Sequence, residues 1–211
     1  MGESISSFPL FPLGLVLLPG EVVPLHIFEE RYKLMIGECL EDDHEFGVVW
    51  VADDGVKETG CAARVTQLVD RADDGEMNIL VQGTKPFRLE RRIEDLPYPA
   101  GDIELLDEED DEPLAGADGA ADAARDRYAD IVERVTDSRP TVDDLNDLDA
   151  YGMAATLDFA LEAKQDLLEL RSEHERLDRL AALFEAAIEQ LDHAEVAAER
   201  ARGNGKVHFR S

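Results

Sequence analysis

Short hydrophobic runs separated by turn residues dominate the first half of the chain. Residues 46–51 (FGVVWV) are continuously apolar, which is typical of a strand covered on both faces. Residues 61–69 and 77–82 predict two further strands, joined at 73–75 (DDG) by a hairpin turn. Apolar and charged residues alternate over 87–93, as in a half-buried strand, and a last strand is expected at 103–106.

One helix interrupts these strands. Its apolar side chains recur at helical spacing, and they are Phe28, Tyr32, Met35, Ile36 and Cys39. We expect this stripe to pack against the sheet, with Phe28 and Tyr32 in the core.

Helical spacing replaces the strand pattern in the second half. The seams predict three helices, along 121–135, 145–159 and 163–191, with Pro140 ending the first and Thr141 capping the second. The third seam is long enough for a coiled coil, but packing against the first two helices is favoured because they offer complementary apolar stripes.

These patterns predict an α+β protein in four parts. They are a β-rich unit over 1–106, an acidic linker or loop over 107–119 (DEEDDEPLAGADG), a helical unit over 120–202 and a tail over 203–211. A length of 211 residues fits one or two compact units.

The charge balance narrows the possible partners. Forty-nine acidic residues against 21 basic ones leave a net charge of −28, which opposes binding to nucleic acid or to an anionic membrane. Only five of the bases are lysines, and an acidic, lysine-poor composition suits a halophilic host. A GC-rich genome would also favour arginine but would not produce this acidity. Because added ions screen the repulsion among the excess acidic residues, we expect the melting temperature to rise between low salt and molar KCl.

Cysteine usage and hydropathy indicate the cellular compartment. Cys39 and Cys61 both lie in apolar patterns and are expected to be buried, reduced thiols. We recognise neither a signal peptide nor an apolar run of the ~20 residues that span a bilayer. A cytoplasmic location is therefore expected.

The common catalytic and ligand-binding patterns are not found. Residues 203–206 (GNGK) lack the spacing of a phosphate loop, no serine lies in a G-x-S-x-G turn, and the five histidines share no metal-ligand spacing. The acidic run 108–112 lacks the calcium-loop pattern and is expected to be a solvated loop. We predict no catalytic residue, no cofactor and no metal, and hence no enzyme.

The most specific pattern lies near the start of the chain. Residues 8–13 (FPLFPL), 16–20 (VLLPG) and 24–32 (PLHIFEERY) resemble the N-terminal substrate-recognition domain of Lon ATP-dependent proteases. The resemblance extends over about 6–192, with further matches at 46–49 (FGVV), 60–63 (GCAA), Gly83, 87–89 (FRL), 97–98 (PY), 164–169 (KQDLLE) and 176–177 (RL). The acidic segment and the tail depart from it.

The resemblance implies a PUA-like pseudo-barrel with one helix, followed by a three-helix bundle. It also implies binding of unfolded or tagged polypeptides in protein quality control, as an adaptor or chaperone-like binder. Because the chain ends at Ser211, we expect a free-standing form without the ATPase and Ser–Lys protease modules, with a separate ATP-dependent protease as a candidate partner.

Aromatic residues near proline turns are the candidate peptide-binding residues, namely Phe11, Phe87 and Tyr98. For His26 we expect a backbone hydrogen bond, and for Glu29 and Arg31 a local ion pair.

Two alternatives remain open. A PUA-like fold would also suit a nucleic-acid or nucleotide-binding protein. The local base cluster for that function is Arg88, Arg91 and Arg92, which Glu90 interrupts, so protein binding is favoured. The other alternative is a hydrolase without a recognisable motif.

Overall fold

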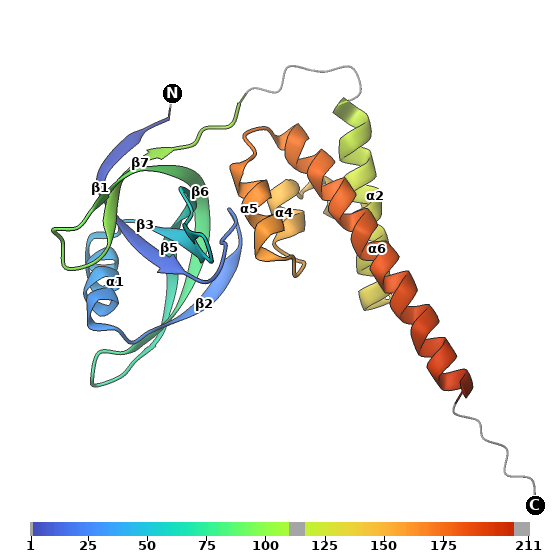
Figure 1. The fold of residues 1–211 in the computed structure, drawn as a ribbon, viewed down its shortest axis with the longest axis horizontal. Helices are drawn as coiled ribbons and strands as arrows, with labels where there is room; N and C mark the ends of the chain where they lie inside the picture. The colour runs from blue at the N-terminus through green and yellow to red at the C-terminus, as the bar shows by residue number, and fades with distance from the viewer. Residues whose placement is uncertain (1, 110–116, 205–211) are drawn as a thin grey trace, which may run out of the picture. The chain divides into compact units, whose positions relative to one another are not determined.

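A computed structural model describes residues 2–109 and 117–204 (Figure 1). The strands are β1 (Ser4–Leu13), β2 (Val22–Ile27), β3 (Phe46–Ala52), β4 (Gly55–Val56), β5 (Thr59–Arg71), β6 (Met77–Ile93) and β7 (Ala100–Leu105). The helices are α1 (Glu30–Asp42), α2 (Ala117–Thr136), α3 (Val142–Asn146), α4 (Ala150–Ala154), α5 (Leu161–Glu169) and α6 (Glu173–Asn204).

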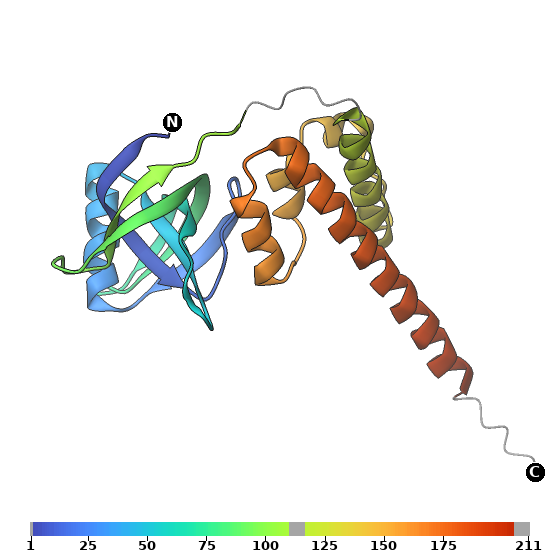
Figure 2. The same cartoon turned by 45° about the horizontal axis from the view of Figure 1, so that its top comes forward.

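The strands form one mixed sheet whose hydrogen-bonded path closes on itself. The order is β1-β7-β6-β5-β3-β4, and β1 also pairs with β3 in parallel, from Leu10 opposite Gly47 to Leu13 opposite Trp50. Strand β2 pairs with the first part of β6. Figures 1 and 2 show these strands curving around a common interior, with α1 along one side. The expected hairpin is present as the antiparallel pair β5–β6.

The core of the sheet follows from the alternation along β6. Its buried side chains meet those of neighbouring strands in a cluster of Phe8, Leu10, Val49, Ala62, Phe87, Leu89 and Ile103. The Phe87 ring fits because its neighbour Gly60 has no side chain, since a Cβ there would lie 2.6 Å from the ring. Glycine at position 60 therefore leaves the space that the Phe87 ring occupies.

Helix α1 buries Tyr32, Met35, Ile36 and Cys39, as the periodicity predicts. The prediction for Phe28 was wrong, because the helix begins after it and its side chain is 58% exposed. Phe28 precedes the N-cap Glu29. An apolar residue at this position often packs against an apolar fourth residue of the helix in a hydrophobic staple. Here the fourth residue is Lys33, which offers no apolar partner of this kind.

The compact units differ from the predicted division of the chain. One unit comprises Met1–Asp110 together with Asp149–Glu173, and the other comprises Asp111–Leu148 together with His174–Ser211. We call them the β unit and the helical unit and describe each by itself. Helices α4 and α5 therefore belong to the β unit, so the predicted boundaries at 106 and 120 do not separate the two.

The prediction of three helices in the second half is also wrong, because the structure describes five helices from residue 117 onward. The predicted second helix divides where the Asp149 side chain accepts a hydrogen bond from the Gly152 amide and starts α4. The predicted third helix divides at 170–172, where Leu170 is extended and Arg171 donates to the Asp107 carbonyl. The Thr141 cap is confirmed as a capping box with Asp144.

The helical unit is joined by contacts between α2 and α6. Arg127 pairs with Glu185 at 3.2 Å, and the Tyr128 and Phe184 rings lie 5.8 Å apart. Helix α2 begins inside the predicted acidic linker. The rest of that linker, at 110–116, and most of the predicted tail, at 205–211, lie outside the described residues.

Candidate functional site

Only one of the three aromatic residues predicted for peptide binding faces solvent. Phe87 is 0% exposed and Phe11 is 5% exposed, with its ring 4.3 Å from that of Tyr32. Phe87 is a core residue, so its prediction as a surface contact is wrong, whereas Phe11 is almost fully buried but lines a hollow described below. Tyr98 is half-buried, and its hydroxyl donates a 2.5 Å hydrogen bond to Glu38 Oε2. Burial and this bond raise the pKa of Tyr98 to about 12, so the hydroxyl keeps its proton at neutral pH.

Tyr98 lies in a largely apolar groove of about 350 Å³, which we call the Tyr98 groove. Its lining comes from β1, the start of α1, β3, β4, the end of β6 and the loop that leads into β7. The lining residues are Leu10, Pro12, Arg31, Val49, Val56, Leu89, Arg92, Ile93, Glu94, Leu96, Pro97, Tyr98, Pro99 and Ala100. Leu96 at the rim is 40% exposed, so the groove offers apolar surface to a ligand.

A second hollow of about 290 Å³ adjoins this groove, because Pro12 and Arg31 line both. We call it the Phe28 hollow, after its exposed phenyl ring, against which the His26 ring stacks at 5.8 Å. Arg31 pairs with Glu29 at 2.8 Å, as expected. The two hollows together form an apolar surface from Leu96 to Phe28. Sequence periodicity placed Phe28 in the core and so missed it, although its position before an N-cap was a usable signal.

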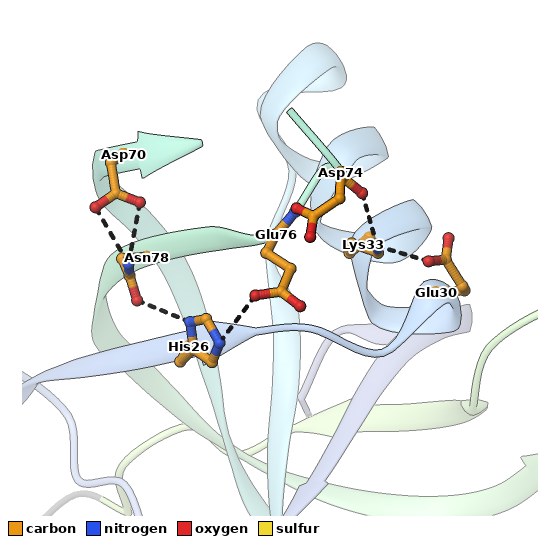
Figure 3. A network of polar contacts seen from close by, with 7 residues as sticks. All are labelled: His26, Glu30, Lys33, Asp70, Asp74, Glu76 and Asn78. Carbon is orange, nitrogen blue, oxygen red and sulfur yellow. Dashed lines mark hydrogen bonds and ion pairs between the residues drawn. The ribbon is translucent and has the colours of Figure 1, made fainter. Parts of the chain in front are cut away.

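His26 belongs to a polar network on the same unit (Figure 3). Its Nδ1 lies 2.9 Å from Asn78 Oδ1, and Asn78 donates in turn to Asp70. Its Nε2 lies 3.5 Å from a Glu76 oxygen. The expected backbone hydrogen bond is therefore replaced by side-chain contacts that join β2 to β6 and β5.

Lys33 joins α1 to the turn between β5 and β6 (Figure 3). Its ammonium group donates to the Asp74 carbonyl at 2.9 Å and pairs with Glu30 at 2.6 Å. The hydrogen bond with Glu30 raises the pKa of Lys33. These contacts position the hairpin between β5 and β6 against α1.

Helix α5 is held against the strands by residues of the run 164–169 (KQDLLE), which therefore has a structural role. Lys164 Nζ lies 2.7 and 2.8 Å from the two carboxylate oxygens of Glu21, which also accepts the Leu18 amide. Gln165 donates to the Thr59 carbonyl at 3.2 Å and to Glu169 at 2.7 Å. Leu167 and Leu168 are buried.

Comparison with known proteins identifies the family of this fold. The sequence profile of the ATP-dependent protease La (LON) substrate-binding domain matches residues 7–185. The chain belongs to the Lon substrate-binding domain family. The predicted resemblance is thereby confirmed.

Relatives and solved structures agree with this Lon assignment. The chain is 26% identical to Lon protease 1 of Hydrogenovibrio crunogenus, over 88% of this chain and 24% of that protein. It is 27% identical to Lon protease of Paraburkholderia phytofirmans, over 95% of this chain and 27% of that protein. The chain thus spans about a quarter of the length of these proteases.

Two solved structures share the fold. A Lon N-terminal domain protein from Xanthomonas campestris superposes with a TM-score of 0.64 at 27% identity, covering 84% of this chain and 98% of that one. The N-terminal domain of Mycobacterium avium complex Lon protease gives 0.66 at 19% identity, covering 87% and 98%. The second likeness shows the fold alone.

Two of the three arginines proposed for nucleic-acid binding are paired with acidic side chains in this Lon domain. Arg91 lies 2.6 Å from Asp102, and Arg88 lies 3.8 Å from Glu104. Arg92 donates to a backbone carbonyl of β4. This pairing lowers the positive field that a phosphate backbone would need.

The part of the chain that the structure describes offers neither an exposed thiol nor a metal-binding cluster. Cys39 and Cys61 are buried, and burial raises the pKa of the Cys39 thiol to about 12 and that of Cys61 further. Among residues 2–109 and 117–204, no three acidic, histidine or cysteine side chains group to hold a metal ion. Over the same residues, no helix has both the length and the apolar character needed to cross a bilayer.

Proposed function

We propose that this Lon substrate-binding domain binds exposed apolar segments of unfolded or tagged polypeptides, without catalytic activity of its own. The observation that carries the proposal is the Tyr98 groove, which is open, largely apolar and continuous with the Phe28 hollow. An extended segment would bury its side chains there, so the main force is hydrophobic. Because the segment must be ordered on binding, we expect dissociation constants on the order of micromolar.

The groove itself favours binding over catalysis. The residues that line it include no serine, cysteine, histidine or lysine, so it offers no usual nucleophile–base pair. The same proposal includes a PUA-like classification of the β unit, a cytoplasmic location and an adaptor or chaperone-like role beside a separate ATP-dependent protease. Support for these parts is the family membership and the paired state of Arg88 and Arg91.

Substitutions at the groove rim test the proposal. Replacing both Leu96 and Tyr98 with serine should weaken binding of a fluorescein-labelled, unstructured apolar peptide by about tenfold, because two apolar contacts are lost. Tyr98→Phe keeps the ring and should bind normally. Fluorescence anisotropy measures the affinities, at low salt and in molar KCl, and affinity should survive the salt because the force is apolar.

Val69→Ser is the matched control, since Val69 is 52% exposed on the same unit and does not line the groove. Its affinity should equal that of the parent protein. Equal affinities for the Leu96→Ser/Tyr98→Ser variant and the parent would contradict the proposed site.

A further inference from the structure

A different hollow, of about 620 Å³, lies between the β3–β4 hairpin and α5, within the β unit. We call it the Trp50 hollow, after the only tryptophan of the chain. Five carboxylates and one lysine line it, namely Asp53, Asp54, Glu162, Asp166, Glu169 and Lys57. The hollow therefore combines an aromatic ring with a strong negative charge, a combination that attracts an organic cation.

The ammonium group of Lys57 is a cation that this hollow already stabilises. Its ammonium nitrogen lies 5.7 Å from the centre of the Trp50 ring and 2.7 Å from Asp54 Oδ2. The hydrogen bond with Asp54 raises the pKa of Lys57, and the charges of Glu169 and Glu162 add to the rise. Carboxylates from both the hairpin and α5 thus act on a single cation.

Gln165 lines the hollow and carries a buried hydrogen-bond acceptor without a donor. Its side chain is 4% exposed, and Nε2 is engaged by Thr59 and Glu169. These two bonds fix the orientation of the amide and leave Oε1 with no donor. A buried carbonyl oxygen without a donor is unfavourable, so an N–H group that entered beside it would be stabilised after a small side-chain shift.

The chemistry of the lining selects the kind of cation. Two of the carboxylates come from the β3–β4 hairpin and three from α5, and among the described residues no three acids group as a metal site requires. A guanidinium group suits such a site because it is planar, stacks on aromatic rings and directs five N–H donors to separate acceptors.

We propose that the Trp50 hollow binds an arginine side chain of a client polypeptide. The inference rests on the proposed function in that the ligand is part of a client. Val49 and Val56 line the Tyr98 groove, and the adjacent residues Trp50 and Lys57 line the Trp50 hollow. The β3–β4 hairpin therefore separates the two, and a segment that places an arginine a few residues from apolar side chains reaches both.

The test uses the full chain and two peptides that share one unstructured apolar segment. One peptide carries an arginine near that segment, and the other carries the neutral isostere citrulline. Anisotropy of the labelled peptides gives affinity, and Trp50 fluorescence reports on the hollow. We expect the arginine peptide to bind about tenfold more tightly and to change the Trp50 emission, because it gains ion pairs with two exposed carboxylates.

Three variants sharpen the test. Glu162→Gln/Asp166→Asn should remove this preference, whereas Glu3→Gln/Asp73→Asn removes the same charge away from the hollow and should keep it. Lys57→Met removes a competing cation and should tighten arginine binding severalfold, an effect opposite to that of general damage.

Equal affinity for the two peptides would overturn the inference while leaving the proposed function intact. About tenfold weaker binding of both peptides to the Leu96→Ser/Tyr98→Ser variant is expected from the proposed function. Failure of both peptides to bind the parent protein would refute that function instead. A loss of preference in both charge variants, or the same Trp50 response to Ca²⁺ alone, would also overturn the arginine assignment.

Discussion

Replacing Lys164 with methionine should destabilise the β unit by about 3–5 kcal/mol, the usual cost of leaving one member of a buried ion pair alone. The side chains of Lys164 and Glu21 are 11% and 14% exposed, and the ammonium group contacts both carboxylate oxygens. Without it, the Glu21 carboxylate would lose its ion-pair partner in a site with little water. Urea unfolding followed by Trp50 fluorescence measures the change, because Trp50 lies in the same unit.

An exposed ion pair of the same chemistry provides the control. Lys85 and Asp107 also lie 2.7 Å apart, but their side chains are 42% and 52% exposed. Lys85→Met should therefore cost less than about 1 kcal/mol. Adding Glu21→Gln to Lys164→Met should recover part of the loss by removing the unpaired charge. If Lys164→Met cost no more than Lys85→Met, the pair would not fasten α5 to the strands.

Phe87→Ala should lower the free energy of unfolding by about 3–5 kcal/mol, because the substitution leaves a cavity in the core. Phe87 is 0% exposed and packs edge-on against Phe8, with ring centres 5.9 Å apart. At a temperature where the variant stays folded, its affinity for the apolar peptide should match that of the parent. Thermal and urea unfolding combined with anisotropy measure both properties on one sample.

Phe28→Ala is the matched control, because the same side chain is removed from an exposed position. Its stability should change by less than about 0.5 kcal/mol, as for most surface substitutions. Its affinity should fall, since Phe28 ends the apolar surface. A Phe87→Ala variant of unchanged stability with weakened peptide binding would contradict this result. It would support the prediction from the proline turns that Phe87 is a surface contact.

Local patterns were sufficient where neighbours in sequence decide the structure. The hairpin between β5 and β6 follows from a turn at 73–75 between two strand patterns, and α1 from its apolar stripe. Proximity to proline turns could not distinguish buried from exposed side chains among the three aromatic candidates. The alternation that predicts β6 places Phe87 on the same face as buried Leu89, and this alternation is a stronger indication of burial than proximity to a proline is of exposure.

Contacts distant in sequence explain what the patterns missed. The apolar seam over 163–191 continues across 170–172, where no glycine or proline signals a break. The break depends on backbone contacts to Asp107 and Glu109, and α5 joins the strands through Glu21, 143 residues away from Lys164. A fragment cut at residue 120 would therefore separate α5 from the unit to which it belongs.

Both candidate binding surfaces depend on the same kind of distant approach. The Tyr98 groove combines β1 and β3 with a loop some 50 residues further on, as its lining from Val49 to Pro99 shows. In the Trp50 hollow, acids of the β3–β4 hairpin and of α5 line the same hollow as the only tryptophan of the sequence. Composition alone could show that acids are abundant, but not that five of them line one hollow with the tryptophan.

Amide hydrogen exchange on the full chain, with and without a saturating apolar peptide, tests the proposed client site most directly. The Tyr98 groove and Phe28 hollow predict slower exchange on binding within 28–34 and 92–102, with little change in α2 and α6. Protection confined to the helices of 117–204, with exchange at 92–102 unchanged, would contradict the account.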